Sequence, residues 1–117
     1  MSNFIFQLGD FNGSDYLELR KGHNLSERKF TRSDSLYILD DAFYFFSEAV
    51  FCEVVADFDM FEETYIPNSQ WEDIMNLDLK EVVALKYFNV VTNTLNAINN
   101  WVNATPNSES GFTVIGV

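Results

Sequence analysis

The pattern that most constrains the fold is a helical periodicity over residues 78–103. Its apolar residues recur three and four positions apart on one side: Val83, Tyr87, Val90, Val91, Leu95, Ile98, Trp101 and Val102. The opposite side carries a stripe of asparagines, which we expect to face solvent: Asn89, Asn93, Asn96, Asn100 and Asn103. Asp78 precedes Glu81 by three residues, an acidic variant of the capping box. The pattern predicts one long amphipathic helix from Asp78 to about Asn103.

Strand patterns lie towards both ends of the chain. Alternating apolar residues at 4–8 and 17–20, separated by the turn sequence 10–14, predict an N-terminal β-hairpin. The apolar run 36–39 predicts a third short strand, and residues 112–117 predict a final strand that can pair with the hairpin. Polar, aperiodic sequence at 21–35 is typical of a loop.

Two further helices are expected in the middle of the chain. Asp40 is a good N-cap for an aromatic helix reaching about Ala56. The narrow side of this helix, which includes Phe51 and Val55, is either covered by another element or forms part of an interface. After a loop at 57–67, Asn68 or Ser69 can cap a short helix through residue 76. Trp71 in this helix is either a core residue or a contact.

These elements predict an α+β protein. A small antiparallel sheet, made of the N-terminal hairpin and the C-terminal strand, packs against two long helices and one short helix. The length of 117 residues fits a single domain, residues 1–117. With 47% hydrophobic residues the chain can bury a sizeable core.

The sequence also predicts the cellular compartment of the protein. No segment has the roughly 18 consecutive apolar residues of a membrane helix, and the most apolar stretch contains Glu48 and Glu53. Residues 1–7 lack the basic and long apolar regions of a secretory signal, so we expect a cytoplasmic protein with no membrane partner. Cys52 is the only cysteine, and we expect it to be a buried small hydrophobe.

Charge is distributed unevenly along the chain. The net charge is −11, yet residues 1–33 hold five basic and four acidic residues. Residues 34–63 hold nine carboxylates and no lysine or arginine. Such a field repels nucleic acid and anionic membranes and attracts basic proteins, although acidity can also serve solubility alone. Nucleic acid is therefore not expected as a partner.

The sequence contains no recognisable catalytic motif. His23 is the only histidine and lies in a polar stretch without a neighbouring cysteine. Neither a Gly-x-Ser-x-Gly elbow nor a Gly-x-x-x-x-Gly-Lys loop occurs. Asp57, Asp59 and Glu62 can hold a cation, but their spacing departs from the calcium-loop pattern. We expect no catalytic residue, no metal site and no cofactor, so the protein is not expected to be an enzyme.

Residues 36–77 contain an extended run at 36–39, an aromatic helix start at 40–43, Phe58-Asp59-x-Phe61, and Ile66-Pro67-x-x-x-Trp71-x-x-Ile74. This succession resembles a run found in bacterial immunity proteins, which protect cells that use contact-dependent growth inhibition and related polymorphic toxins. It implies a protein that binds and neutralises a cognate toxin domain. Toxins of this kind are often nucleases with basic active sites, which an acidic inhibitor can block.

The leading hypothesis is therefore an immunity protein that occludes the active site or substrate surface of a basic toxin, a nuclease C-terminal domain. The residues expected to bind it are Asp57, Asp59, Phe61, Glu62, Glu63, Tyr65, Glu72 and Asp73. Phe61 and Tyr65 are the candidate anchors among them. The alternatives are an acidic nucleic-acid mimic that inhibits basic proteins, and a small metal-dependent enzyme that uses the carboxylates of residues 57–63.

Overall fold

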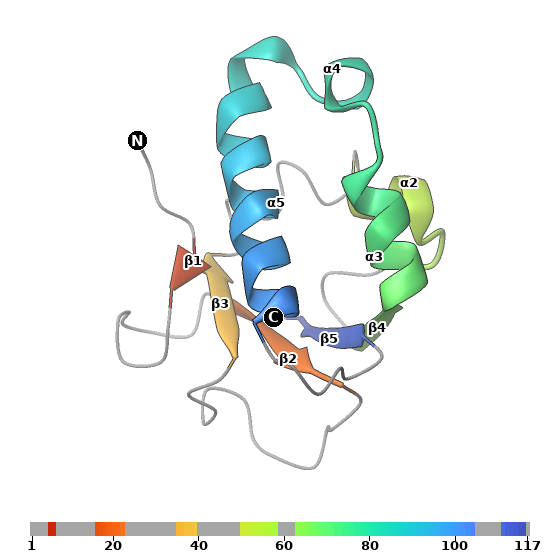
Figure 1. Ribbon diagram of the computed structural model, residues 1–117, viewed down its shortest axis with the longest axis vertical. Helices are drawn as coiled ribbons and strands as arrows, with labels where there is room; N and C mark the ends of the chain where they lie inside the picture. Colours follow the sequence, from red (N-terminus) through yellow and green to blue (C-terminus); the bar gives the residue numbers. More distant parts are fainter. Residues whose placement is uncertain are drawn as a thin grey trace.

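The computed structural model describes residues 5–6, 16–22, 35–39, 50–58, 63–104 and 111–116. The strands are β1 (Ile5–Phe6), β2 (Tyr16–Lys21), β3 (Leu36–Leu39), β4 (Glu63–Pro67) and β5 (Gly111–Ile115). The helices are α2 (Cys52–Val54), α3 (Asn68–Met75), α4 (Leu79–Val82), the 3-10 helix η2 (Leu85–Tyr87) and α5 (Phe88–Asn103). The predicted α+β class is confirmed, with the elements arranged as in Figure 1.

The five strands form one antiparallel sheet in the order β1-β3-β2-β5-β4. The strand predictions at 17–20, 36–39 and 112–117 are confirmed within the described residues. The predicted pairing of the first two strands is wrong, because β3 lies between β1 and β2. All four residues of β3 are apolar, and Leu36, Tyr37 and Ile38 are buried, as expected for a strand covered on both faces.

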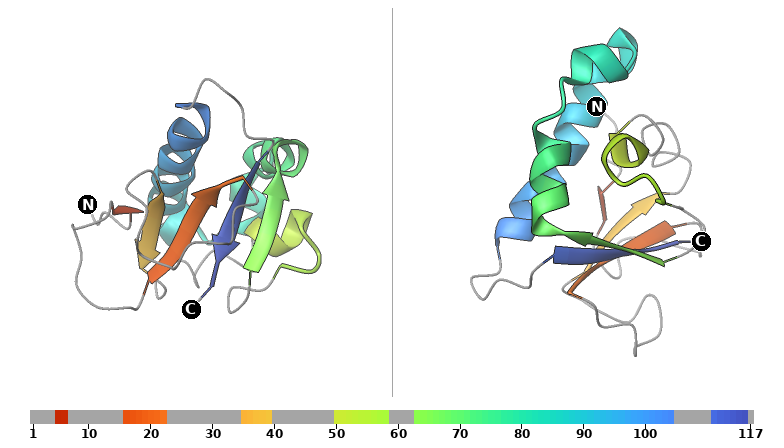
Figure 2. Two further views of the ribbon diagram at one scale, coloured as in Figure 1. Left: turned by 90° about the horizontal axis from the view of Figure 1, so that it is seen from below. Right: turned by 90° about the vertical axis from the view of Figure 1, so that its right-hand side faces the viewer.

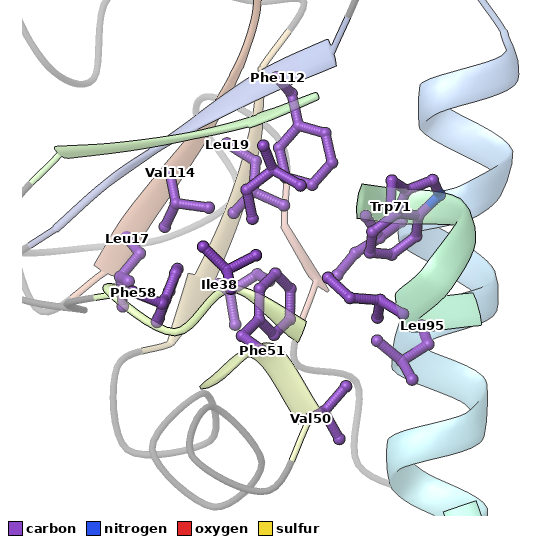
Figure 3. Packing of buried hydrophobic residues seen from close by; sticks show 14 of the residues in the cluster. Leu17, Leu19, Ile38, Val50, Phe51, Phe58, Trp71, Leu95, Phe112 and Val114 are labelled. Carbon is purple, nitrogen blue, oxygen red and sulfur yellow. The ribbon is translucent and has the colours of Figure 1, made fainter. Parts of the chain in front are cut away.

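The helices cover one face of this sheet (Figure 2). Alternate strand residues point into the space between the two layers, among them Leu17, Leu19, Ile38 and Val114, where they meet side chains from the helices (Figure 3). Phe112 extends this core through edge contacts with both tryptophans, at centroid distances of 5.4 Å to Trp71 and 5.7 Å to Trp101. The core therefore joins the sheet to α3 and α5. Trp71 is 3% exposed, so its interpretation as a core residue is confirmed.

The long helix predicted from Asp78 to Asn103 is interrupted. Asp78 caps α4 by accepting a hydrogen bond from the backbone N–H of Lys80 at 3.1 Å, as the capping pattern predicted. The helix then ends, and Val83 is extended at φ −120° and ψ 135°. Because the helix is interrupted, α4 runs in a different direction from α5 and connects the end of α3 to the start of α5 (Figure 1).

The amphipathic pattern of α5 is confirmed. Val91, Leu95 and Ile98 are buried against the core. The predicted solvent stripe is exposed at every position: Asn89, Asn93, Asn96, Asn100 and Asn103. Asn99, which is not part of that stripe, accepts a hydrogen bond from the Trp71 indole N–H at 3.0 Å and so connects α5 to α3.

The two middle helices differ from prediction at their ends. Of the helix expected at 40–56, residues 40–49 and the Asp40 cap lie outside the described residues. The described part, Val50 to Val54, is helical and ends at Val55. Phe51 and Val55 are buried, so the narrow side of this helix is covered at these two positions. Cys52 is only partly buried, and its thiol lies 3.8 Å from the Phe58 carbonyl oxygen.

An N-cap at Asn68 would make Ser69 the first residue of helix α3, but the helix begins one residue earlier. Asn68 is the first helical residue, and the N-cap position falls on Pro67, which has no side chain able to accept a hydrogen bond. The predicted cap at Asn68 or Ser69 is therefore wrong, while the predicted helix is confirmed. No described helix is long and apolar enough to cross a membrane.

The sheet face opposite the helices holds a buried ion pair on β2. The Arg20 Nε donates to Glu18 Oε2 at 2.9 Å and its Nη2 donates to Glu18 Oε1 at 3.1 Å, and both side chains are at most 1% exposed. The Ser35 hydroxyl donates to Glu18 Oε2 at 2.8 Å. This network satisfies both carboxylate oxygens, which a buried charge requires.

Candidate functional site

Strand β4 forms one side of the candidate site. Residues 57–67 were predicted to be a loop, and that prediction is wrong for residues 63–67, which pair along their whole length with β5. Ile66 is buried in the core, whereas Glu63 is exposed on the opposite sheet face. Charge and Pro67 are tolerated because β4 is the outermost described strand at its end of the sheet.

The turn after α2 forms the other side. The Val55 N–H donates to the Phe51 carbonyl oxygen at 2.8 Å, and the Phe58 N–H donates to the Val55 carbonyl oxygen at 3.0 Å. The rings of Phe51 and Phe58 contact each other in the core, with centroids 5.1 Å apart and planes tilted by 39°. Both ends of the turn are thus anchored in the core, while Asp57 between them is exposed.

A cleft of about 460 Å³ lies between these two segments. Its lining consists of Val55, Asp57, Glu63, Thr64, Tyr65, Pro67 and Gln70. We call it the β4 cleft. Thr64 lies on the helix-covered face of β4, while Glu63, Tyr65 and Pro67 alternate onto the other face. The cleft therefore reaches around the outer side of the strand.

Two further carboxylates lie on a neighbouring helix. Glu72 and Asp73 are exposed on α3, which packs beside both α2 and β4 (Figure 1). The described segments 50–58 and 63–79 contain no lysine or arginine. We call Asp57, Glu63, Glu72 and Asp73 the acidic surface. Its charges lie on neighbouring elements, so their potentials add over one side of the protein.

The structure brings together three of the eight residues expected to bind a partner. Asp57, Glu63 and Tyr65 line the β4 cleft. Glu72 and Asp73 are exposed nearby on α3 but do not line the cleft. Asp59, Phe61 and Glu62 lie outside the described residues.

Three lining residues were not anticipated: Thr64, Pro67 and Gln70. Val55 had been named only on the helix side that could form part of an interface. Thr64, Tyr65 and Ile66 all have side chains that favour strands, and this run was the available signal for β4. A strand here places alternate residues on opposite faces. Residues of both faces line the cleft, because the cleft reaches around the outer side of this strand.

A metal centre receives no support from the described residues. Within those ranges no three histidine, cysteine, aspartate or glutamate side chains are grouped so that they could hold a metal ion. Asp59 and Glu62, named with Asp57 as a potential cation site, lie outside the described residues, as does His23.

Comparison with known proteins found no matching family model, no matching curated protein and no matching solved structure. The proposal for function therefore rests on the sequence and on the chemistry of the β4 cleft and the acidic surface.

Proposed function

We propose that this protein is an immunity protein that binds a basic toxin domain and neutralises it by occlusion. The observation that carries the proposal is the β4 cleft, whose lining includes Asp57 and Glu63 from separate segments, together with Tyr65. Glu72 and Asp73 extend the negative charge over α3. The partner would be the toxic domain of a cognate effector, a nuclease whose substrate-binding surface is basic.

Electrostatic attraction supports such a role. A concentrated negative surface raises the association rate with a basic partner by orders of magnitude at low salt. The two carboxylates of the cleft can also form direct ion pairs with the partner's cations. An inhibitor of this kind needs no chemistry of its own, because covering the substrate-binding surface is sufficient.

The partner can be identified by affinity capture from the native cell lysate at physiological salt. Recovery of one stoichiometric protein that ends in a basic toxic domain is the expected result. Capture of many basic proteins, all released by moderate salt, would instead identify a general nucleic-acid mimic. A rise in melting temperature on adding calcium or manganese, with no partner recovered, would favour the metal-dependent alternative.

The contribution of the cleft is tested with charge reversals measured against that partner. Asp57→Lys with Glu63→Lys is expected to weaken binding at least tenfold, mainly through slower association at low salt. Glu53→Lys with Glu81→Lys is the matched control, because it changes the net charge equally at exposed positions outside the cleft. Equal losses in the two variants would assign the effect to total charge and not to the cleft.

A further inference from the structure

Helix α5 carries an uncharged face on its solvent side. Five asparagines form this face, and all are exposed: Asn89, Asn93, Asn96, Asn100 and Asn103. We call these five residues the asparagine face. It lies opposite the buried residues of α5, so it points away from the sheet that α5 covers (Figure 2). Residues 87–108, which include all of α5, contain none of the 18 acidic and 7 basic residues of the chain.

Contact with water does not by itself explain this composition. Glutamate, lysine, arginine and glutamine all favour a helix more than asparagine does. An exposed helix face usually carries charged residues of this kind. The neighbouring helix α4 does so, with Lys80 and Glu81 exposed. Five asparagines lower the intrinsic stability of α5, which suggests that their amide groups serve a contact.

The asparagine face has the spacing of a surface that pairs with another helix. Its residues follow one another at intervals of four, three, four and three. A mean interval of 3.5 residues keeps one stripe against the same neighbour along two packed helices, and asparagine at such a position fixes their register. An amide side chain both donates and accepts hydrogen bonds. Identical asparagines from two helices can therefore pair.

Apolar side chains border the asparagine face on one side. Val90 and Ala97 lie seven residues apart and are half-buried, so each keeps some apolar surface exposed beside the asparagines. The short side chain of Ala97 leaves room for a second helix, because the distance between helix axes depends on the side chains at the contact. Asn99, on the other side, is bonded to Trp71 of α3. The contact surface therefore combines amide groups with a small apolar border.

Charge indicates what the asparagine face contacts. A basic partner is attracted by carboxylates and gains no electrostatic attraction from an uncharged helix. Two copies of a chain with a net charge of −11 repel each other where their carboxylates meet, so an uncharged face is where they can approach. A two-fold axis brings the same surface of both copies together. The asparagine face fits this arrangement, because its hydrogen-bonding groups are complementary to themselves.

We infer that α5 forms the interface of a weak homodimer, in which the asparagine faces of two copies pack against each other. Asparagine side chains hydrogen-bond across the interface, while Val90 and Ala97 supply apolar contact. A helix of 16 residues is only about 24 Å long, so its interface is smaller than that of a permanent dimer. We expect a dissociation constant of about 0.1 mM, which leaves the protein monomeric at low micromolar concentration.

The dimer is independent of the proposed function, because it uses α5 and not the acidic surface. Sedimentation equilibrium of the full chain between about 10 μM and 1 mM tests it. The mean mass should rise from that of a monomer towards that of a dimer. Added salt should strengthen association, since it screens the repulsion between two acidic copies. A monomeric mass throughout, or weaker association at high salt, would overturn the inference.

Two double variants test whether the asparagine face is the interface. Asn89→Glu with Asn96→Glu places like charges on both sides of the contact and should raise the dissociation constant at least tenfold. Glutamate favours a helix more than asparagine does, so circular dichroism should show an unchanged fold. Ser69→Glu with Ala84→Glu is the matched control, because it adds the same charge at exposed positions outside α5. Equal losses in both variants would overturn the interface.

NMR of the unsubstituted, isotope-labelled protein locates the contact without any variant. Amide shifts of residues 89–100 should change with protein concentration, whereas those of residues 52–57 and 63–67 should not. Concentration-dependent shifts confined to other elements would overturn the assignment to α5.

The outcomes separate this inference from the proposed function. If the protein stays monomeric and residues 89–100 respond only to a captured toxin, the face belongs to the toxin interface and the dimer inference fails. If the dimer forms through α5 but no single partner is captured, the dimer stands and the proposed function fails.

Discussion

Lys21 contacts Trp101 in two ways. Its Nζ donates a hydrogen bond to the Trp101 carbonyl oxygen at 2.8 Å, and the same ammonium lies 4.9 Å from the centre of the indole ring. Lys21 is the last residue of β2, and Trp101 lies in the last turn of α5. A strand side chain therefore places a positive charge at the helix C-terminus, where it adds a second hydrogen bond to the Trp101 carbonyl oxygen, which also accepts from the Ala104 N–H at 3.2 Å.

Replacing Lys21 with methionine should lower the free energy of unfolding by about 1 kcal/mol, because the helix end loses both its hydrogen bond and its positive charge. Urea denaturation followed by tryptophan fluorescence measures this. Lys80→Met, at an exposed position on α4, is the charge-matched control and should change stability little. Equal effects in the two variants would show that the loss comes from net charge alone.

Asn99 and Asn96 lie on the same helix, and replacing each with alanine should change the stability of the protein in opposite directions. Asn99→Ala leaves the buried Trp71 N–H without its acceptor and should cost about 1–2 kcal/mol. Asn96 is exposed, so Asn96→Ala should stabilise the protein by a few tenths of a kcal/mol through the higher helix propensity of alanine. Chemical denaturation of both variants under the same conditions provides the comparison. Two equal changes would contradict the contact between α3 and α5.

Replacing one partner of the ion pair on β2 should lower the unfolding free energy more than replacing both partners. Glu18→Leu removes the carboxylate that accepts two hydrogen bonds from the buried Arg20 guanidinium, and the expected loss of unfolding free energy is about 3–5 kcal/mol. The double variant Glu18→Leu with Arg20→Met removes both charges and should be closer to the wild type than either single variant. A thermodynamic cycle from urea denaturation tests this, and additive losses would show that the two side chains do not act as a pair.

Gly111 should not tolerate a side chain. A Cβ at this position would overlap the Ile66 carbonyl oxygen and would lie 2.8 Å from the Pro67 Cα, both on the neighbouring strand. Gly111→Ala should therefore push β4 away from β5 and lower the unfolding free energy by about 3 kcal/mol. Thermal and urea denaturation measure the loss, and hydrogen exchange should show faster opening at residues 63–67. Unchanged exchange there would contradict the close approach of the two strands.

Elements with a strong local pattern were predictable from the sequence. The buried side of α5 follows from its periodicity, and the start of α4 follows from Asp78. The position of β3 between two strands was not predicted, because alternation says which face a residue occupies but not which strand lies beside it. The unbroken apolar run of β3 was the available indication of an interior strand.

The candidate site was predictable only in part, because a local sequence pattern does not say which segments lie side by side. The carboxylate density around Asp57 and Glu63 pointed to the correct region of the chain. The cleft itself depends on how the turn after α2 lies against β4, a contact between segments that carries no local sequence signal. Gln70 could not be singled out for this reason, although it lines the cleft.

Strand β5 lies between β2 and β4, although it is the last described strand in the chain. The ribosome synthesises β4 before β5. Because β4 pairs with β5 in this sheet, it cannot join the sheet until translation has passed residue 115. Pairing β2 with β5 also joins segments distant in sequence, which slows folding. Nascent chains halted before β5 would lack the strand that pairs with β4, so the outer end of the sheet, which carries one side of the β4 cleft, assembles only after β5 has been synthesised.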